Sequence, residues 1–362
     1  MTPLEPYVSV VIPTRDRPWY ARRAVRSVLA QQGVRVQVVL VDDGSETPLA
    51  DTIGLDDPRV LIVRHCSSLG VAAARNRGID VADGPWVAFL DDDDMWAPDK
   101  LQRQLEAATA AGAQWCITAA LHLNVSSNPT SLHECPAEAA AVQRGLCSHN
   151  SVPGGGSGVL VSQRALALVG GFAESLSMCA DWEMWHRLAH ALPCAIVADP
   201  LVGYTIHESS MTSQFADHAS EMTRMDSLVS TYCDRSPKER RLVYATWAAT
   251  NLANHDRSRS ARLLVGVAAS RRSPRLAFLA ARILLVPTTF SVRRFVGLPL
   301  LPVPSSAPAW VTRVEIGPEM NNPSRGEGAP PRPRARNRLR SPGPTLTQPR
   351  ADSPVQTPSG VL

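Results

Sequence analysis

Short apolar runs alternate with segments of helical periodicity between residues 8 and 112. The apolar runs lie at 8–13, 36–41, 60–63 and 86–90. Apolar residues recur at helical spacing over 18–32, 71–81 and 99–112, and a glycine ends two of these segments, at Gly33 and Gly112. Because each run is apolar throughout, we expect helices on both faces of the strands. The pattern predicts an α/β fold with a doubly wound, mostly parallel, Rossmann-like central sheet.

The pattern is weaker after residue 112. It predicts a strand at 115–121, an irregular loop region at 123–151 and a short strand at 159–161. It then predicts a helix that ends at Gly170, a helix at 181–191 and a short strand at 195–197. These elements extend the α/β region to about residue 215.

The composition changes again in the C-terminal third of the chain. Residues 216–302 are rich in Ala, Leu and Arg, which predicts a helical extension. Within it, the segment 275–295 combines apolar residues with arginines and is too short to span a bilayer. Two interpretations stay open: the segment lies on an anionic membrane surface, or it packs against the domain as a helix hairpin. Residues 303–362 are rich in Pro, Gly, Ser and Arg and are predicted to be a disordered tail.

The charge is unevenly distributed along the 362 residues. The formal net charge is +4, while residues 321–350 hold seven arginines and one acid, Glu327. That stretch therefore contributes about +6 and the rest of the chain about −2. The basic balance is a property of the tail, so we expect no nucleic-acid binding by the folded part.

Cysteine usage and the N-terminus bear on the compartment. The seven cysteines are scattered and form no CxxC pair, which is typical of a reducing environment. The N-terminus shows no signal-peptide pattern, and no apolar run approaches the roughly 20 residues of a membrane span. We expect a cytoplasmic protein, and the segment 275–295 leaves a peripheral position at the inner face of the membrane open.

Four consecutive carboxylates, Asp91 to Asp94, directly follow the apolar run 86–90. Crowding four acids costs repulsion and desolvation, and a bound divalent cation offsets both. Mg²⁺ uses one or two carboxylates and completes its shell with phosphate oxygens and water. The end of a parallel strand is also where open α/β sheets bind ligands. The alternative is a solvated acidic loop that caps the next helix.

Three further positions carry possible chemistry. Asp42 and Asp43 precede Gly44-Ser45, so they form a ligand-reading turn, a helix N-cap or an Asx turn. Asp181 lies among apolar and aromatic residues, where the pKa of a carboxyl rises toward the range of a general base; the alternative is an N-capping aspartate. His207 is either a metal contact or a structural histidine.

Five motifs occur in one order: VSVVIPT at 8–14, VDDGS at 41–45, GVAAARNRGID at 70–80, FLDDDDMWAPDKL at 89–101, and GGF with ADWEMW at 170–185. Together they resemble the family 2 glycosyltransferases of the GT-A fold. The resemblance covers about residues 7–210. It implies a glycosyltransferase domain at 1–215, with a nucleotide-binding half at about 7–112 and an acceptor half at about 113–215.

The resemblance also implies roles for individual residues. The positions matched to the donor nucleotide are Pro13, Thr14, Asp43, Arg75 and Asp92, with Asp43 reading the base. Those matched to a Mn²⁺ or Mg²⁺ ion are Asp91, Asp93 and His207, with Asp93 as the expected ligand. Asp181 matches the general base that activates an acceptor hydroxyl for inverting transfer.

The expected donor is a nucleotide sugar, by resemblance most often UDP-linked. The acceptor is a glycan, lipid carrier, protein or small metabolite. The extension lacks the Gln-x-x-Arg-Trp segment and the transmembrane helices of processive synthases, so transfer of single sugars is expected. Two alternatives stay open, a nucleotidyltransferase and a catalytically silent nucleotide-sugar-binding or scaffold protein. The first is disfavoured because residues 13–17 contain no glycine.

Overall fold

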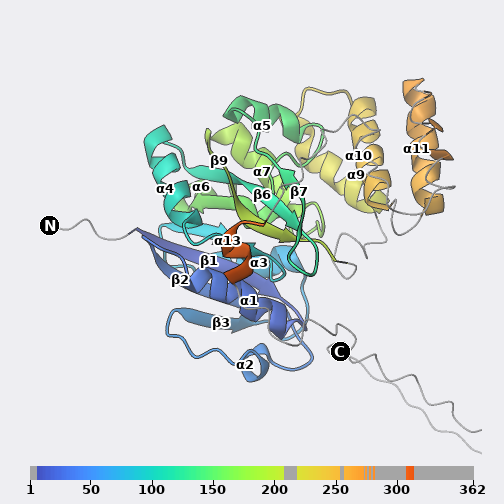
Figure 1. Cartoon of the computed structure of the whole chain (residues 1–362). Coiled ribbons are helices and arrows are strands. Elements are labelled where there is room, and N and C mark those ends of the chain that lie inside the picture. Colours follow the sequence, from blue (N-terminus) through green and yellow to red (C-terminus); the bar gives the residue numbers. More distant parts are fainter. Residues whose placement is uncertain are drawn as a thin grey trace, which may run out of the picture. The chain divides into compact units, whose positions relative to one another are not determined.

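A mixed sheet runs through the described part of the chain (Figure 1). The computed structural model describes residues 6–207, 218–252, 257–272 and 307–313, with a few positions between 274 and 281. All of these belong to one compact unit, Met1–Glu315; a second unit, Ile316–Leu362, lies outside the described residues.

The strands are β1 Tyr7–Thr14, β2 Arg35–Asp42, β3 Val60–Arg64, β4 Trp86–Phe89, β5 Met95–Trp96, β6 Trp115–Leu123, β7 Pro129–His133, β8 Val159–Ser162 and β9 Cys194–Thr205. Their order is β3-β2-β1-β4-β8-β6-β9-β5, with β7 paired to β6. The first four strands in this order are parallel, and β6 and β9 are also parallel to each other. Antiparallel pairs enter with β8, β7 and β5.

The helices are α1 Pro18–Leu29, α2 Leu49–Thr52, α3 Val71–Asp80, α4 Lys100–Ala111, α5 Ala139–Leu146, α6 Gln163–Val169, α7 Ala180–Ala191, α9 His218–Val229, α10 Pro237–Leu252, α11 Arg257–Arg271 and α13 Ala309–Arg313. Two 3₁₀ turns, Gly155–Gly158 and Ser230–Tyr232, complete the set in the described residues. No described helix combines the length and apolar character that a membrane crossing requires.

Alternate residues of the parallel strands enter two separate cores. Val11, Val39 and Phe89 face a cluster that includes α3, α6 and α7. Their neighbours, such as Val10 and Val38, face a second cluster built with α1 and α4. Successive side chains of a strand point to opposite faces, so burial on both faces requires the continuous apolar runs seen in the sequence. The predicted α/β fold with helices on both faces is confirmed.

An aromatic group fixes α7 on the strand that precedes the four acids. The Phe89 and Phe172 ring centroids are 5.0 Å apart in an edge-to-face arrangement. Trp185 of α7 contacts both rings and stacks on Trp115 at 6.5 Å. Such pairs add about 0.5–1.5 kcal/mol each beyond the area that they bury. The orientation of α7, which carries Asp181, is therefore tied to β4.

Several sequence predictions need correction. The expected loop region 123–151 contains β7 and α5. In α5 only Val142 and Leu146 are buried, and two positions are too few to show a helical period in the sequence. The short strand at 195–197 is part of β9, which continues through Asp199-Pro200 with register shifts in its pairing to β6. The two-residue strand β5 was not predicted at all.

The C-terminal segments also depart in part from prediction. Helices α9, α10 and α11 agree with a helical extension. Residues 282–306, which include most of the segment 275–295, lie outside the described residues. The tail predicted to be disordered from 303 contains α13, whose Val311 is fully buried against Met95, Leu121 and Leu123. That part of the tail prediction is wrong.

Lys100, at the start of α4, is a fully buried basic residue. Its Nζ donates to Gln104 Oε1 at 2.7 Å and lies 3.9 Å from the centroid of the Trp96 ring. Gln104 in turn donates to the carbonyls of Cys116 and Gly158. Burial lowers the pKa of Lys100 to about 7, because the low-dielectric interior disfavours the charged amine.

This burial predicts a pH-dependent stability. An unfolded lysine titrates near 10.4, so the unfolded chain binds more protons than the folded chain between about pH 7 and 10. The free energy of unfolding of the wild type, relative to Lys100→Met, should rise by about 1.4 kcal/mol per pH unit over this range. Urea unfolding of both proteins at pH 7 and pH 9.5 measures the difference. Equal pH slopes for the two proteins would contradict a neutral buried lysine.

Candidate functional site

The carboxyl ends of β1, β2 and β4 meet at one edge of the sheet. Thr14 pairs in register with Asp42, and Val11 pairs with Phe89, so the residues after these strands are neighbours. Thr14 Oγ1 donates to Asp92 Oδ2 at 2.6 Å. Thr14 and Asp92, both matched to donor binding, are thus in contact. Pro13 is buried one residue earlier, opposite Val41.

Asp94 and Asp91 point to different partners. Asp94 is fully buried and accepts from Ser157 Oγ at 2.6 Å and from the Thr205 backbone N–H at 2.9 Å. Asp91 pairs with Arg75 at 2.5 Å. Ser157 also accepts from the Asp91 backbone N–H. Asp94 therefore joins the acid loop, 91–94, to the glycine-rich turn, 154–158, and to the end of β9.

Arginines of the loop after β1 and of α1 lie against the other two acids. Arg17 Nη1 is 3.5 Å from Asp92 Oδ1 and 3.3 Å from Asp93 Oδ2. The buried Arg23 donates to the Asp93 carbonyl and to Thr205 Oγ1. Burial, reinforced by the charge of Asp93, raises the pKa of Asp92, and Arg17 opposes that rise. Neither arginine was predicted for the site, although Arg17 belongs to the Thr-Arg-Asp-Arg run that follows β1.

Asp93 and His207 form a close pair. Asp93 Oδ2 lies 2.8 Å from His207 Nε2, and the His207 ring stacks on Tyr20 with centroids 5.4 Å apart. The carboxylate and the imidazole contact each other directly, and both are groups that can ligate a divalent cation. In the described residues no group of three His, Cys, Asp or Glu side chains is arranged as a metal cage. An ion here would complete its shell with phosphate oxygens and water, which suits Mg²⁺ or Mn²⁺.

Of the three residues matched to the metal, Asp91 stands apart from this pair. Its carboxylate is engaged by Arg75, whereas Asp93 and His207 contact each other. Asp93 and His207 are therefore adjacent, while Asp91 is the partner of the neighbouring arginine. The metal-binding role of all three residues stays a prediction.

Asp43 uses its carboxylate inside the chain. Its Oδ1 accepts from His65 Nδ1 at 2.8 Å and from the Leu69 N–H at 2.9 Å. Its Oδ2 accepts from Ser68 Oγ at 2.7 Å and from the Gly70 N–H at 3.0 Å. Burial alone would raise its pKa, but these hydrogen bonds outweigh burial and lower it. A carboxylate offers about four acceptor positions, so Asp43 holds the loop before α3, and reading a base requires displacement of one of these donors.

Arg75 lies between the acid loop and Asp181. It is almost fully buried on α3, pairs with Asp91 and sits over the Phe172 ring at 5.2 Å. Among the described residues, its guanidinium Nε has no hydrogen-bond partner. The charges of Asp91 and Asp181 outweigh its burial and raise its pKa. The structure thus brings together three of the predicted site residues, Asp91, Arg75 and Asp181.

The glycine-rich turn passes next to this group. A Cβ added at Gly156 would lie 3.1 Å from Arg75 Nη2, and one added at Gly155 would lie 3.0 Å from Asp181 Oδ2. Gly154 and Gly155 have φ of +67° and +53°, a region that favours glycine. At Gly155 and Gly156 the turn therefore brings backbone close to both charged groups with no side chain in between.

Asp181 occupies the first turn of α7 and is partly exposed. Its Oδ1 accepts from the Trp182 N–H at 2.6 Å and its Oδ2 from Asn150 Nδ2 at 3.2 Å. Burial raises the pKa of Asp181 to about 6, and the charge of Arg75 opposes the rise. A carboxyl with this pKa is ionised at neutral pH and more basic than a solvated aspartate, as a general base requires.

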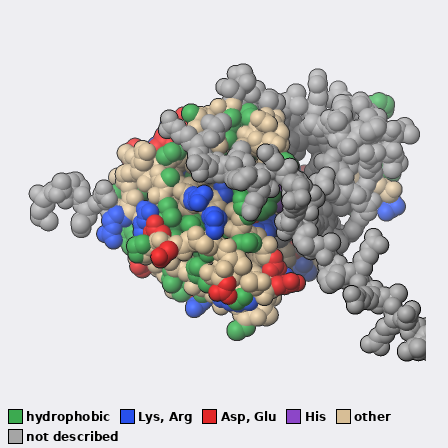
Figure 2. Space-filling model, turned by 60° about the horizontal axis from the view of Figure 1, so that its bottom comes forward, with side chains coloured by type: hydrophobic (Ala, Val, Ile, Leu, Met, Phe, Trp, Pro, Cys, Tyr) green, Lys and Arg blue, Asp and Glu red, His purple; other side chains and the backbone are tan. Residues whose placement is uncertain are grey.

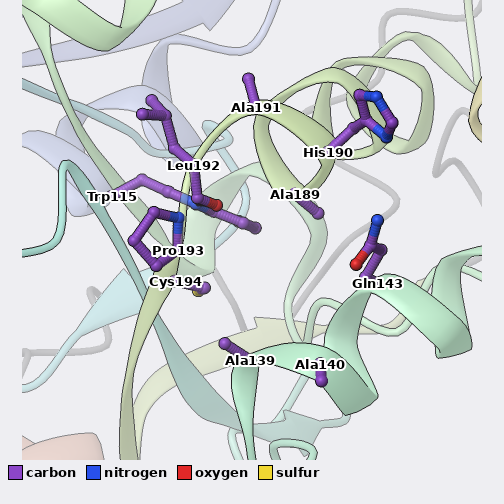
Figure 3. A pocket seen from close by; sticks show the side chains of 10 residues that line it. All are labelled: Trp115, Ala139, Ala140, Gln143, Ala189, His190, Ala191, Leu192, Pro193 and Cys194. Atoms are coloured by element: carbon purple, nitrogen blue, oxygen red, sulfur yellow. Dashed lines mark hydrogen bonds between the residues drawn. The ribbon is translucent and has the colours of Figure 1, made fainter.

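A cavity of about 350 Å³ lies at the other edge of the sheet (Figure 3). It is lined by Trp115, by Ala140 and Gln143 of α5, and by His190 and Cys194 around the end of α7. Trp115 and Cys194 begin β6 and β9. Because β4 and β6 are each antiparallel to β8, the start of β6 is at the edge opposite the acid loop. This cavity is separate from the acid loop, Arg75 and Asp181.

The described surface in Figure 2 mixes charges of both signs. Acidic and basic side chains are interspersed with apolar ones, and the described part of this face carries no continuous basic area.

Comparisons with known proteins extend these observations. Residues 9–155 match the model of the family described as "Glycosyl transferase family 2". The succinoglycan biosynthesis protein ExoO of Rhizobium meliloti is 50% identical over 94 residues, which are 25% of this chain and 27% of that protein. The putative teichuronic acid biosynthesis glycosyltransferase TuaG of Bacillus subtilis is 38% identical over 109 residues, which are 29% of this chain and 43% of that protein. The chain thus spans less than half the length of these two relatives.

A solved structure is similar over more of the chain. Residues 1–349 of S. aureus TarS superpose with a TM-score of 0.54 at 14% identity, covering 77% of this chain and 87% of that one. At this identity the similarity concerns the fold, and it agrees with the GT-A fold expected from the motifs. The order of the motifs, the match to the family model and the shared fold point the same way: residues 9–155 of the chain are those of a glycosyltransferase family 2 domain.

Proposed function

We propose that the protein transfers a single sugar from a nucleotide-sugar donor to an acceptor hydroxyl, with inversion at the anomeric carbon. The observation that carries this proposal is that the acid loop forms two pairs, Asp93 with His207 and Asp91 with Arg75, and that Asp181 lies beside Arg75. This arrangement combines a site for a cation and a diphosphate with a carboxylate suited to take a proton.

Two relatives and one fold neighbour support the substrate class. TarS has been determined in complex with UDP-GlcNAc, which supports a UDP-linked donor here. ExoO and TuaG are described by the biosynthesis of succinoglycan and teichuronic acid, which supports a glycan acceptor.

In the proposed reaction Asp181 accepts the proton of the acceptor hydroxyl while that oxygen attacks the anomeric carbon. The bond from the anomeric carbon to the diphosphate oxygen breaks, and the nucleoside diphosphate leaves with the electron pair. A Mn²⁺ or Mg²⁺ ion held by Asp93 and His207 would neutralise the growing charge on the diphosphate. Arg75 pairs with Asp91, and its charge opposes the rise in the pKa of Asp181. Thr14 holds Asp92 at the nucleotide end of the group.

Replacing the proposed base should abolish turnover without abolishing binding. Asp181→Asn keeps the shape of the side chain but removes the proton acceptor, so kcat should fall about 10²–10⁴-fold. The release of nucleoside diphosphate from a UDP-sugar, assayed with Mn²⁺, measures turnover, and calorimetry measures donor affinity. Asn150→Ala, which removes a neutral partner of Asp181, is the milder comparison. Wild-type turnover by Asp181→Asn would exclude the assigned role.

The pKa of Asp181 predicts an acid limit to activity. Only the ionised carboxylate accepts a proton, so kcat/KM should fall about tenfold per pH unit below pH 6. Arg75→Met removes the charge that opposes the rise, so the midpoint should move to higher pH. A pH profile from 5 to 8 for both proteins measures the shift. A flat profile, or a midpoint near 4, is the contrary result.

The pair of Asp93 and His207 predicts metal-dependent donor binding. Mn²⁺ should tighten UDP-sugar binding to the wild type, and Asp93→Asn should reduce that gain at least about tenfold, or about 1.4 kcal/mol. Asp57→Asn, at an exposed ion pair with Arg59, is the matched control and should behave as wild type. Calorimetric titrations with and without Mn²⁺ provide the measurement. Equal donor affinities with and without metal in the wild type would contradict a cation site.

A further inference from the structure

The residues that precede Asp181 present three backbone N–H groups to one buried carboxylate. Glu221 Oε1 accepts from Ser177 at 2.8 Å, from Met178 at 2.7 Å and from Cys179 at 2.9 Å. Cys179 is the N-cap residue of α7, and Asp181 follows two positions later. Consecutive N–H groups that point to one place form an anion-binding nest, and the N-terminus of a helix adds a favourable dipole.

Glu221 belongs to α9, 40 positions after Asp181 along the chain. Its side chain is fully buried, and its second oxygen lies 3.2 Å from Arg224 Nη2. Its neighbours Met222 and Met225 enter the same core as Trp182 and Trp185 of α7. Burying a carboxylate costs desolvation free energy, so buried carboxylates are normally hydrogen-bonded. Here the three N–H groups supply those hydrogen bonds.

We infer that Glu221 of the helical extension is a positioning residue for Asp181: it fixes the segment 177–179 and thereby the direction in which the proposed base points. The inference rests on the proposed role of Asp181. It assigns the extension a part in turnover, because the acceptor of these three hydrogen bonds comes from α9 rather than from the α/β region.

Three substitutions at Glu221 distinguish an effect on the position of Asp181 from a general loss of fold stability. Glu221→Ala leaves three N–H groups without their acceptor, and we expect kcat to fall about 10- to 100-fold. Glu221→Asp keeps the charge but withdraws the acceptor by one methylene, and we expect about a tenfold loss with the fold retained. Glu221→Gln keeps an acceptor oxygen of the same reach, so kcat should stay within about threefold of wild type. Because the donor site is elsewhere, the KM for the UDP-sugar should stay unchanged in all three.

The matched control is Glu239→Ala. Glu239 Oε2 accepts from the Ser236 N–H at 2.9 Å and from Ser236 Oγ at 2.7 Å, so it caps the start of α10 in the same extension. Its loss should lower thermal stability without changing kcat. In an Asp181→Asn background, Glu221→Asp should give no further loss of turnover, since both changes act through one carboxylate.

Hydrogen exchange supplies a readout that does not depend on activity. The amides of Ser177, Met178 and Cys179 should exchange at least about tenfold faster in Glu221→Asp than in wild type, and at wild-type rates in Glu239→Ala. Wild-type kcat in Glu221→Asp, an equal loss in Glu239→Ala, or unchanged exchange at 177–179 would each overturn the inference. If the wild type releases no nucleoside diphosphate, the proposed function fails, and exchange at the three amides still decides whether Glu221 holds this segment.

Discussion

Four adjacent carboxylates have to coexist at the end of a buried strand, and the site is organised around that constraint. Each acid of the loop 91–94 has a different partner. Asp91 meets Arg75, Asp92 meets Thr14, Asp93 meets His207, and Asp94 meets Ser157 together with the end of β9. Because the partners come from four separate segments, satisfying the acids also brings those segments together. The hydrogen bonds and ion pairs that offset the repulsion within this short loop thus also connect distant parts of the sheet.

The same constraint explains what the sequence predicted well and what it did not. Continuous apolar runs predicted β1, β2 and β4, because strands buried on both faces need such runs. The acid loop was predicted to be a binding site because its four carboxylates directly follow the apolar run of β4. Which of four consecutive acids pairs with His207 depends on loop geometry and on partners more than a hundred residues away. The sequence therefore predicted the group of residues, while the separation of Asp91 from Asp93 required coordinates.

Other features that the sequence did not predict have similar causes. The acceptor positions of Asp43 are used by the loop 65–70, whose residues carry no periodic signal, and its role in reading a base stays a prediction. Glu221 was not singled out, because a glutamate on a helix is usually solvent-exposed. Strand β5 has two residues and α5 lies in a mostly polar stretch, so neither offers a window long enough for periodicity to show.

Helix α13 changes where the folded part of the protein ends. Val311 is fully buried against Met95, which directly follows the acid loop, and Trp310 packs near Gly203 of β9, four residues before His207. A chain cut at 302, the boundary suggested by composition, would uncover these apolar surfaces beside both members of the Asp93–His207 pair. Exposed apolar area of this kind promotes self-association. Shortened versions intended for crystallisation or assay should therefore keep residues 307–313.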